Sequence, residues 1–509
     1  MKWIDKQKEN QANDLYNCSV YFIWENMTKI LLTLCCILFI VSANYTIAVS
    51  EYSIDGDLDP LVDISLTVDI LAIRALDEIE RGSDPDFFVN LIINNEEFTS
   101  PTWNDQNYLY DCWSVTTDVP DDVENASVTI ELWDSNNTLN EKCDISEKSN
   151  TIDDGYFVDL IYNLKTGHWY EDDYSIGNKS GYGRACGCGD GSIYLDENDC
   201  EVWFNIYQND FDNDSMPYWV ETNIYGTDPT YNNTGEDHDL DGVPIEWEHK
   251  WGFNPLIWED HENYDPDNDS LTNVEEYLTR DFGSDPFRQD VFLELDYMEE
   301  SPDGTISVIP EESKELLKNP FHRRNIVFHI DSGEVDGGEI LPFDDTVVFD
   351  EVREIYSNNF LNNDENHWKR GVFHYGLIVY DCFPGGYGFS GDVSPYWGYI
   401  PGTNGFIISS KHTEKNDRWV FSKSLDYIYG SAIMHEMGHN FGIRGGNPPG
   451  CDNRGCIYPW RLGFWLYWNY KSCMNYRYTY KIFDYSDGSH GIRDFDDWEA
   501  IDLTYFEIP

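Results

Sequence analysis

Three stretches in the early part of the chain have the residue pattern of β-strands. Ile64–Ile73 and Ser127–Trp133 are rich in β-branched and apolar residues, which favours strands. Phe87–Ile93 is a third apolar run, with Asp, Pro and Asn residues at its ends that are typical of turns. We therefore predict a β-sandwich over residues 51–165. Residues 166–205 are rich in Gly and Cys and show little periodicity, which predicts a loop-rich connector.

The pattern changes near residue 290. Apolar runs there indicate buried strands, and a further run indicates an edge strand. The buried runs are Val291–Tyr297, Asn325–Asp331 and Gly371–Tyr380, and the predicted edge strand is Asn404–Ser410. A helical pattern over Phe349–Tyr356 lies between them. This alternation of strands and helices predicts an α/β domain with a small sheet over residues 290–509.

Residues 206–289, between these two regions, carry a threefold acidic repeat. Each copy has acids at positions 1, 3, 5 and 12 of a loop, which is the spacing of an EF-hand-like calcium loop. The acids are Asp210, Asp212, Asp214 and Glu221 in the first copy, Asp237, Asp239, Asp241 and Glu248 in the second, and Asp265, Asp267, Asp269 and Glu276 in the third. Calcium prefers six to eight oxygen ligands, so we predict three Ca²⁺ sites. The alternative is a solvated acidic linker.

Position 6 of each loop must turn sharply, and glycine is the usual residue there. Gly242 meets this requirement, whereas Ser215 and Ser270 depart from it. Each copy ends in a Gly-x-Asn/Asp-Pro turn. The array resembles thrombospondin type 3 and related secreted calcium repeats, which implies that calcium stiffens this segment and protects it from proteolysis.

The C-terminal region contains the segment Ser431–Gly442, with the sequence SAIMHEMGHNFG. On a helix, the HExxH pattern places His435 and His439 one turn apart on the same face, where both can bind one zinc ion. Glu436 lies beside them as a candidate general base for a zinc-activated water. An amphipathic helix with two unrelated histidines is the alternative interpretation.

The residues around this motif resemble the metzincin clan of zinc peptidases. Gly442 lies where that clan ends its helix, and Ser472–Tyr476 is similar to the clan's Met-turn. The resemblance implies that Met474 lies beneath the zinc ligands and that Tyr476 stabilises an oxyanion. It covers the last 220 residues and is closest to pappalysin-like and prokaryotic secreted members.

One position departs from the clan's pattern. The third ligand is expected six residues after His439, where this chain has Gly445. Catalytic zinc sites use three protein ligands, so another residue must complete the site or the domain is an inactive relative. The nearest candidates are Asn447, Asp452 and His490, and more remote ones are Asp484, Asp494, Asp496, Asp497 and Glu499.

The N-terminus indicates export. Lys29, the apolar run Ile30–Val41 and the small residues that follow are typical of a signal peptide, and Met27 is a possible true start. We therefore expect a signal peptide or a retained anchor in residues 1–50, and a protein that is secreted or held at the cell surface.

Cysteines in an exported chain favour disulfides, and Cys112 and Cys143 are a candidate pair within the β domain.

The net charge of −63 argues against nucleic-acid binding, which needs Lys and Arg to neutralise phosphates. The only membrane contact that we expect is the possible N-terminal anchor.

The β domain resembles a C2 domain, in which Asp84 and Asp134 match ligand positions, although calcium binding there is not expected from two matches. Residues 184–190 are faintly similar to the cysteine-switch segment of matrix metalloproteinases, but a structural role for the cysteines is the simpler interpretation.

Taken from the sequence alone, the chain is expected to be an exported zinc endopeptidase that binds Zn²⁺ and Ca²⁺ and acts on a protein or peptide. The alternative is a catalytically inactive, calcium-dependent adhesion or matrix protein with a degenerate metzincin fold.

Overall fold

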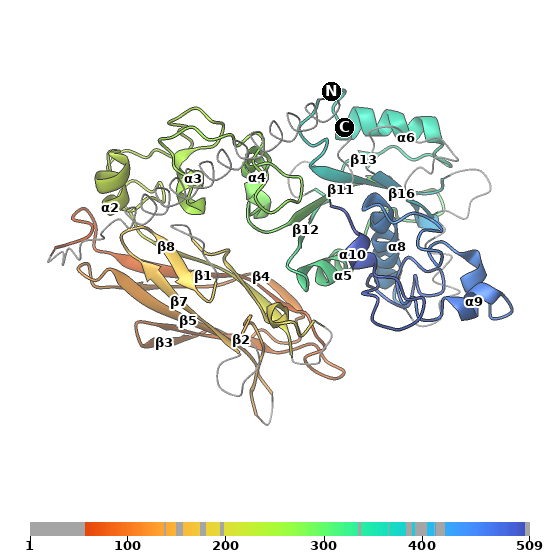
Figure 1. Ribbon diagram of the computed structural model, residues 1–509, viewed down its shortest axis with the longest axis horizontal. Helices are drawn as coiled ribbons and strands as arrows, with labels where there is room; N and C mark the ends of the chain where they lie inside the picture. The colour runs from red at the N-terminus through yellow and green to blue at the C-terminus, as the bar shows by residue number, and fades with distance from the viewer. Residues whose placement is uncertain are drawn as a thin grey trace, which may run out of the picture. The chain divides into compact units, whose positions relative to one another are not determined.

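The computed structural model of the chain describes residues 56–503 with internal gaps (Figure 1). The gaps are residues 137–138, 149–155, 174–179, 194–197, 334–336, 365, 383–388, 392–404, 412 and 414–422. The signal peptide or anchor predicted in residues 1–50 lies outside the described residues. Within the described part of the chain, no helix is both long enough and apolar enough to cross a membrane.

The N-terminal part is a sandwich of two antiparallel sheets. The first has the order β4 (Tyr108–Asp118), β1 (Ser65–Ala75), β10 (Cys200–Gln208), β9 (Arg184–Cys186). The second has the order β3 (Glu96–Thr99), β2 (Phe87–Ile93), β5 (Asn125–Asp134), β7 (Phe157–Asn163), β8 (His168–Glu171), with β6 (Glu141–Lys142) paired to β5. Side chains of β2 and β5 alternate between buried and more exposed positions, because successive residues of a strand face opposite sides of the sheet. Leu66 and Phe204 of the first sheet share one core with Val89 and Ile130 of the second.

The separate connector predicted for residues 166–205 is wrong, since this segment belongs to the sandwich. β10 pairs with β1 from Gln208 opposite Leu66 to Cys200 opposite Ala75, and β8 and β9 extend the two sheets. Cys200, Val202, Phe204 and Ile206 alternate along β10 and are buried. This alternation was visible in the sequence, but the Gly-rich turn after β9 obscured it.

No cysteine in the described residues forms a disulfide. The pair considered from the sequence, Cys112 with Cys143, does not occur: the Cys112 sulfur lies 3.9 Å from the carbonyl oxygen of Leu71. Cys143 hydrogen bonds with Cys200 instead, and burial together with this contact raises the pKa of Cys200 well above 9.0. Disulfide formation itself stays a prediction, with Cys143 and Cys200 as neighbours in the core.

Each acidic loop leads into a short helix and a glycine turn. The helices are α2 (Tyr218–Val220), α3 (Ile245–Trp251) and α4 (Asn273–Leu278). Gly226, Gly252 and Gly283 end the three units with φ angles of 74°, 73° and 90°, a left-handed conformation that glycine adopts without steric cost. The closing turn predicted from the sequence is therefore present in every copy.

The C-terminal part is an α/β domain around one mixed sheet. The order is β12 (Val327–Asp331), β11 (Asp290–Met298), β14 (Phe373–Val379), β16 (Gly405–Ser409), β15 (Phe389–Gly391), with β13 (Ile340–Leu341) paired to β11. All pairs are parallel except β15 with β16. The strand predicted at the edge is therefore not the edge, because the antiparallel β15 lies outside β16.

Helices cover both faces of this sheet (Figure 1). α5 (Glu311–His322) and α8 (Leu425–Asn440) share a core with Leu293 and Leu295 of β11. α6 (Phe349–Ile355) lies on the other face, where its Val352 and Ile355 pack near Phe292. All residues of β11 are buried, as expected for a strand covered on both sides. Two short helices, α9 (Leu462–Leu466) and α10 (Asp497–Ala500), follow α8.

A buried cluster of charges ties the sandwich to α5. Glu201 of β10 lies 3.1 Å from Arg74 Nε, 2.6 Å from Arg184 Nη2 and 2.8 Å from His322 Nδ1. Arg74 also forms an ion pair with Glu315 of α5. Burial by itself would raise the pKa of Glu201, but His322, Arg184 and Arg74 outweigh burial and hold it well below 4.5.

Glu201→Gln should destabilise the protein, because it keeps the side-chain shape but leaves two buried arginines without their common counter-charge. We expect a loss of about 3–5 kcal/mol in the free energy of unfolding, measured by urea denaturation. Glu124→Gln is the matched control, since Glu124 forms a partly exposed pair with Lys165 at 2.6 Å and should cost under about 1 kcal/mol. Equal effects of the two substitutions would contradict the role given to Glu201.

Candidate metal centre

α8 carries the HExxH motif and has well-defined ends. Its N-cap Ser424 accepts a hydrogen bond from the Tyr427 backbone N–H, which satisfies one of the free donors of the first turn. At its C-terminus, Gly442 has a φ of 93°. The Gly442 N–H donates to the His439 carbonyl at 3.1 Å, and the Ile443 N–H donates to the Gly438 carbonyl at 2.9 Å. These two bonds form a Schellman motif, as the position of Gly442 in the sequence suggested.

The same turn orients the second histidine. His439 Nδ1 lies 2.5 Å from the Ile443 carbonyl oxygen, and His435 Nδ1 lies 2.9 Å from the Cys473 carbonyl oxygen. A carbonyl can only accept, so each ring carries a proton on Nδ1 and turns Nε2 towards the same space. This arrangement is the usual support for a metal-binding histidine.

Asp452 occupies the space that both Nε2 atoms face. Its Oδ1 lies 3.0 Å from His435 Nε2, and its Oδ2 lies 3.2 Å from His439 Nε2. Bonds of about 2.0–2.1 Å to a tetrahedral zinc ion separate its ligand atoms by about 3.3 Å. The three side chains are therefore spaced as a zinc ligand set requires, and they form one of the groups in the described residues that could hold a metal ion.

Asp452 also explains the glycine at position 445. A Cβ atom on Gly445 would lie 2.9 Å from Asp452 Oδ2, which is closer than real Cβ contacts. The carboxylate of Asp452 thus fills the place of a side chain at position 445.

The other two candidates for a third ligand lie elsewhere. Asn447 is exposed in the loop after α8. His490 belongs to a separate group, in which its Nδ1 lies 2.9 Å from Asp494 Oδ2 and 3.6 Å from Asp487 Oδ1. Of the remoter acids, Asp484 accepts from Trp498 and Asp497 accepts from Tyr470, so neither faces the histidines.

Ser472–Tyr476 lies beneath the histidines, as the Met-turn resemblance implies. The Met474 sulfur packs against Gly438 so closely that a Cβ there would lie 2.4 Å from it. The Asp452 N–H donates to the Met474 carbonyl at 3.1 Å, while Cys473 supplies the carbonyl that holds His435. This one turn therefore positions two of the three candidate ligands.

Burial and charge act against each other at this centre. Burial by itself would raise the pKa of Asp452, but hydrogen bonds from His435 and His439 hold it well below 3.8. Burial by itself would lower the pKa of His439, but the hydrogen bond and charge of Asp452 raise it to about 9. Glu436 is fully buried next to them. Tyr476 stacks on His435 with a ring separation of 5.6 Å, and burial, followed by the charges of Asp452 and Glu436, raises its pKa above 10.0.

The three acidic loops share one geometry. In each loop, the first Asp accepts backbone hydrogen bonds from positions 4 and 6. Position 6 is left-handed in all three, with φ angles of 69° at Ser215, 106° at Gly242 and 80° at Ser270. The two serines that depart from the template therefore adopt the conformation of the glycine, and the twelve predicted acids fall into loops of the expected form.

The loops contain carboxylates without compensating charge. Glu221, Glu248 and Glu276 are each at most 1% exposed. Burial and neighbouring acids raise the pKa of Glu221 to about 8 and that of Glu248 to about 9. In the third loop, burial and neighbouring acids raise the pKa of Asp267 to about 9. Such repulsion is relieved when a cation binds among the acids.

Sequence reasoning missed one residue at each loop, contributed by the unit that follows. The N–H groups of Asn233 and Asp290 donate to Asp214 and Asp269 at 3.2 and 2.7 Å. In the second loop the Glu259 N–H takes this place and donates to Asp241 Oδ2 at 3.2 Å. Asn233, Glu259 and Asp290 each follow the closing glycine of their loop by seven residues, and this constant spacing was the signal that could have revealed them. His261, two residues after Glu259, also reaches the second loop, with Nε2 at 3.3 Å from Asp241 Oδ2.

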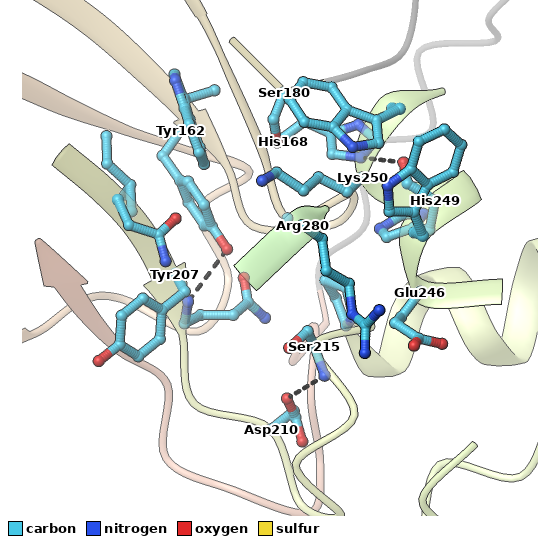
Figure 2. Close-up of a pocket in the computed structure, with 18 of the residues that line it drawn as sticks. Tyr162, His168, Ser180, Tyr207, Asp210, Ser215, Glu246, His249, Lys250 and Arg280 are labelled. Atoms are coloured by element: carbon cyan, nitrogen blue, oxygen red, sulfur yellow. Dashed lines mark hydrogen bonds between the residues drawn. The ribbon is translucent and has the colours of Figure 1, made fainter. Parts of the chain in front are cut away.

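A cavity of about 680 Å³ lies between the sandwich and the repeats (Figure 2). Its histidines are used structurally: His168 Nε2 hydrogen bonds with the His249 carbonyl oxygen at 2.9 Å, and His249 Nε2 hydrogen bonds with the Thr166 carbonyl oxygen at 2.9 Å. Burial lowers the pKa of His168 to about 4 and that of His249 to about 3, so both stay neutral near pH 7. Asp210 and Ser215 of the first acidic loop lie at its wall.

Two weaker resemblances noted in the sequence concern residues of the sandwich. Asp134 accepts from the Asp86 N–H at 2.8 Å and from Asn136 at 3.0 Å, while Asp84 accepts from Asn107 at 2.5 Å. The two acids therefore have separate hydrogen-bond partners. The segment similar to a cysteine switch is packed within the sandwich, where Cys188 Sγ lies 3.2 Å from Asp199 Oδ2.

No family model and no curated protein matches this chain. The solved structures that match include human GIVD cytosolic phospholipase A2, at 12% identity and a TM-score of 0.18, with 30% of this chain and 17% of that chain covered. They also include a C2 domain, at 10% identity and a TM-score of 0.18 (28% and 98% covered), and a C2 domain of plant Extended Synaptotagmin 1, at 8% and 0.18 (30% and 96% covered). Scores this low carry no argument, so the C2 and metzincin resemblances stay predictions.

Asp452→Ala should remove bound zinc from the purified full-length protein, because it deletes one of three converging ligands. We expect elemental analysis to find that the zinc held by His435 and His439 is lost. Asn447→Ala and His490→Ala serve as controls and should keep this zinc. Loss of this zinc in either control variant, or its retention in Asp452→Ala, would contradict the ligand set.

Calcium removal should expose the acidic repeats to protease. With the cation gone, the crowded acids repel one another, so we expect excess EGTA to speed trypsin cleavage after Lys250 and Arg280, and added Ca²⁺ to reverse the effect. Peptide mapping by mass spectrometry gives the cleavage sites. An unchanged cleavage rate in EGTA would show that the loops need no cation.

Proposed function

We propose that the chain is an exported zinc-dependent endopeptidase. The observation that carries the proposal is the convergence of His435, His439 and Asp452, with their Nε2 and carboxylate atoms 3.0–3.2 Å apart, beside the buried Glu436. A set of two histidines and one carboxylate is a known ligand set of catalytic zinc. Zinc bound there supplies Lewis acidity and lowers the pKa of a water molecule towards ~7.

The residues of the chain have separate tasks in this proposal. Glu436 follows His435 directly on α8 and takes the proton from the attacking water, then delivers it to the leaving amine. Tyr476 keeps its hydroxyl proton at neutral pH, because its pKa lies above 10.0, and so can donate a hydrogen bond to the carbonyl oxygen as negative charge develops there. Met474 and Gly438 fix the floor of the site.

In this proposal the sandwich and the acidic repeats are accessory, and they take no part in the hydrolysis. The first and third acidic loops present only oxygen ligands, which suit Ca²⁺, and we assign calcium to them as a structural cation. The inactive adhesion protein remains the second candidate. Its main support was the missing histidine at position 445, and the presence of Asp452 in that space weakens it.

Glu436→Gln should abolish cleavage of a fluorescently labelled unfolded protein while zinc content stays unchanged. The substitution keeps size but removes the base, and we expect a loss of about 10²–10⁴-fold in kcat. Glu499→Gln, at an exposed position of α10, is the control and should cleave normally. A wild-type protein that holds zinc but cleaves no peptide bond in any unfolded substrate would favour the inactive relative.

A further inference from the structure

The second acidic loop has an imidazole beside its acids. The Glu259 N–H holds the place at this loop that the N–H groups of Asn233 and Asp290 hold at the first and third loops. His261, two residues after Glu259, adds a nitrogen donor next to Asp241 and Glu248. Calcium takes oxygen ligands almost without exception, while imidazole suits zinc and related transition metals.

His261 is completely buried and faces the acids. Its exposed fraction is 0%, and its Nε2 lies 3.3 Å from Asp241 Oδ2 and 4.0 Å from Glu248 Oε1. Despite this proximity, Nε2 makes no hydrogen bond in the described structure, and neither do the two carboxylate oxygens of Glu248, also 0% exposed. Buried polar atoms normally have partners, so these three atoms point to a ligand.

The surroundings hold the imidazole in place. Phe253 and Trp247 pack edge-on against the His261 ring, with centroid separations of 4.9 and 6.1 Å. Behind the ring, the side-chain amide of Asn273 lies 2.7 Å from Nδ1. A half-turn of this amide places Oδ1, which has no other partner, where it accepts the Nδ1 proton. The lone pair of Nε2 then faces the carboxylates, as in metal sites supported by a second hydrogen bond.

We infer that the second loop is a mixed imidazole–carboxylate site for a transition-metal dication of the zinc type, with His261, Asp241 and Glu248 as its ligands. Asp239, whose carboxylate oxygens also lack hydrogen-bond partners, supplies the fourth position. The site is independent of the proposed peptidase centre, and the same chain would therefore hold two zinc ions for two different purposes.

The test is a count of tightly bound metal in the full-length protein, dialysed against Zn²⁺ in excess Ca²⁺. We expect two zinc ions per chain in the wild type. His261→Asn should lose one zinc, with affinity at that site falling about 10-fold or more, and should gain one Ca²⁺, because the amide offers an oxygen in place of the imidazole nitrogen. This gain also shows that the variant is folded.

His238→Asn is the matched control. His238 lies in the same loop but points outwards to Glu236, at 3.1 Å, and its replacement should leave both counts unchanged. His439→Ala should remove only the other zinc. If the wild type binds one zinc that is lost only in His439→Ala, the inference is overturned and the peptidase proposal stands. If its single zinc is lost only in His261→Asn, the inference stands and the peptidase proposal fails.

Discussion

The candidate centre depends on the contacts that the Asp452 carboxylate makes with the imidazoles of His435 and His439. It requires that both rings protonate Nδ1, which in turn requires carbonyl oxygens from Ile443 and Cys473. Those carbonyls come from the turn that ends α8 and from the turn that contains Met474. The turn that ends α8, the Met-turn and the loop that carries Asp452 therefore support one another. Each is needed to keep the histidine Nε2 atoms 3.0 and 3.2 Å from the Asp452 carboxylate.

The sequence predicted the parts of this unit whose signal is local. His435, Glu436 and His439 follow from spacing on one helix, and Gly442 from the need for a left-handed residue at its end. The acidic loops were equally accessible, because all four acids of each loop lie within twelve residues. Ser215 and Ser270 did not disturb the prediction, since a small residue can take the left-handed conformation at modest cost.

Residues that depend on tertiary contacts were harder to predict. Asp452 was one of several candidates, because nothing local distinguishes it from Asn447 or His490; the space at Gly445 decides between them only in three dimensions. β10 was missed as part of the sandwich, since its partner β1 lies far away in the chain. His261 was missed because it belongs to the unit after the loop that it faces.

The glycine at position 445 has a consequence for how such a centre can change. A side chain at 445 would enter the space of the Asp452 carboxylate, with its Cβ 2.9 Å from Oδ2. A histidine introduced at 445 would therefore force the Asp452 carboxylate to move, and loss of Asp452 alone would leave two ligands. Exchange between these two ligand sets requires changes at both positions.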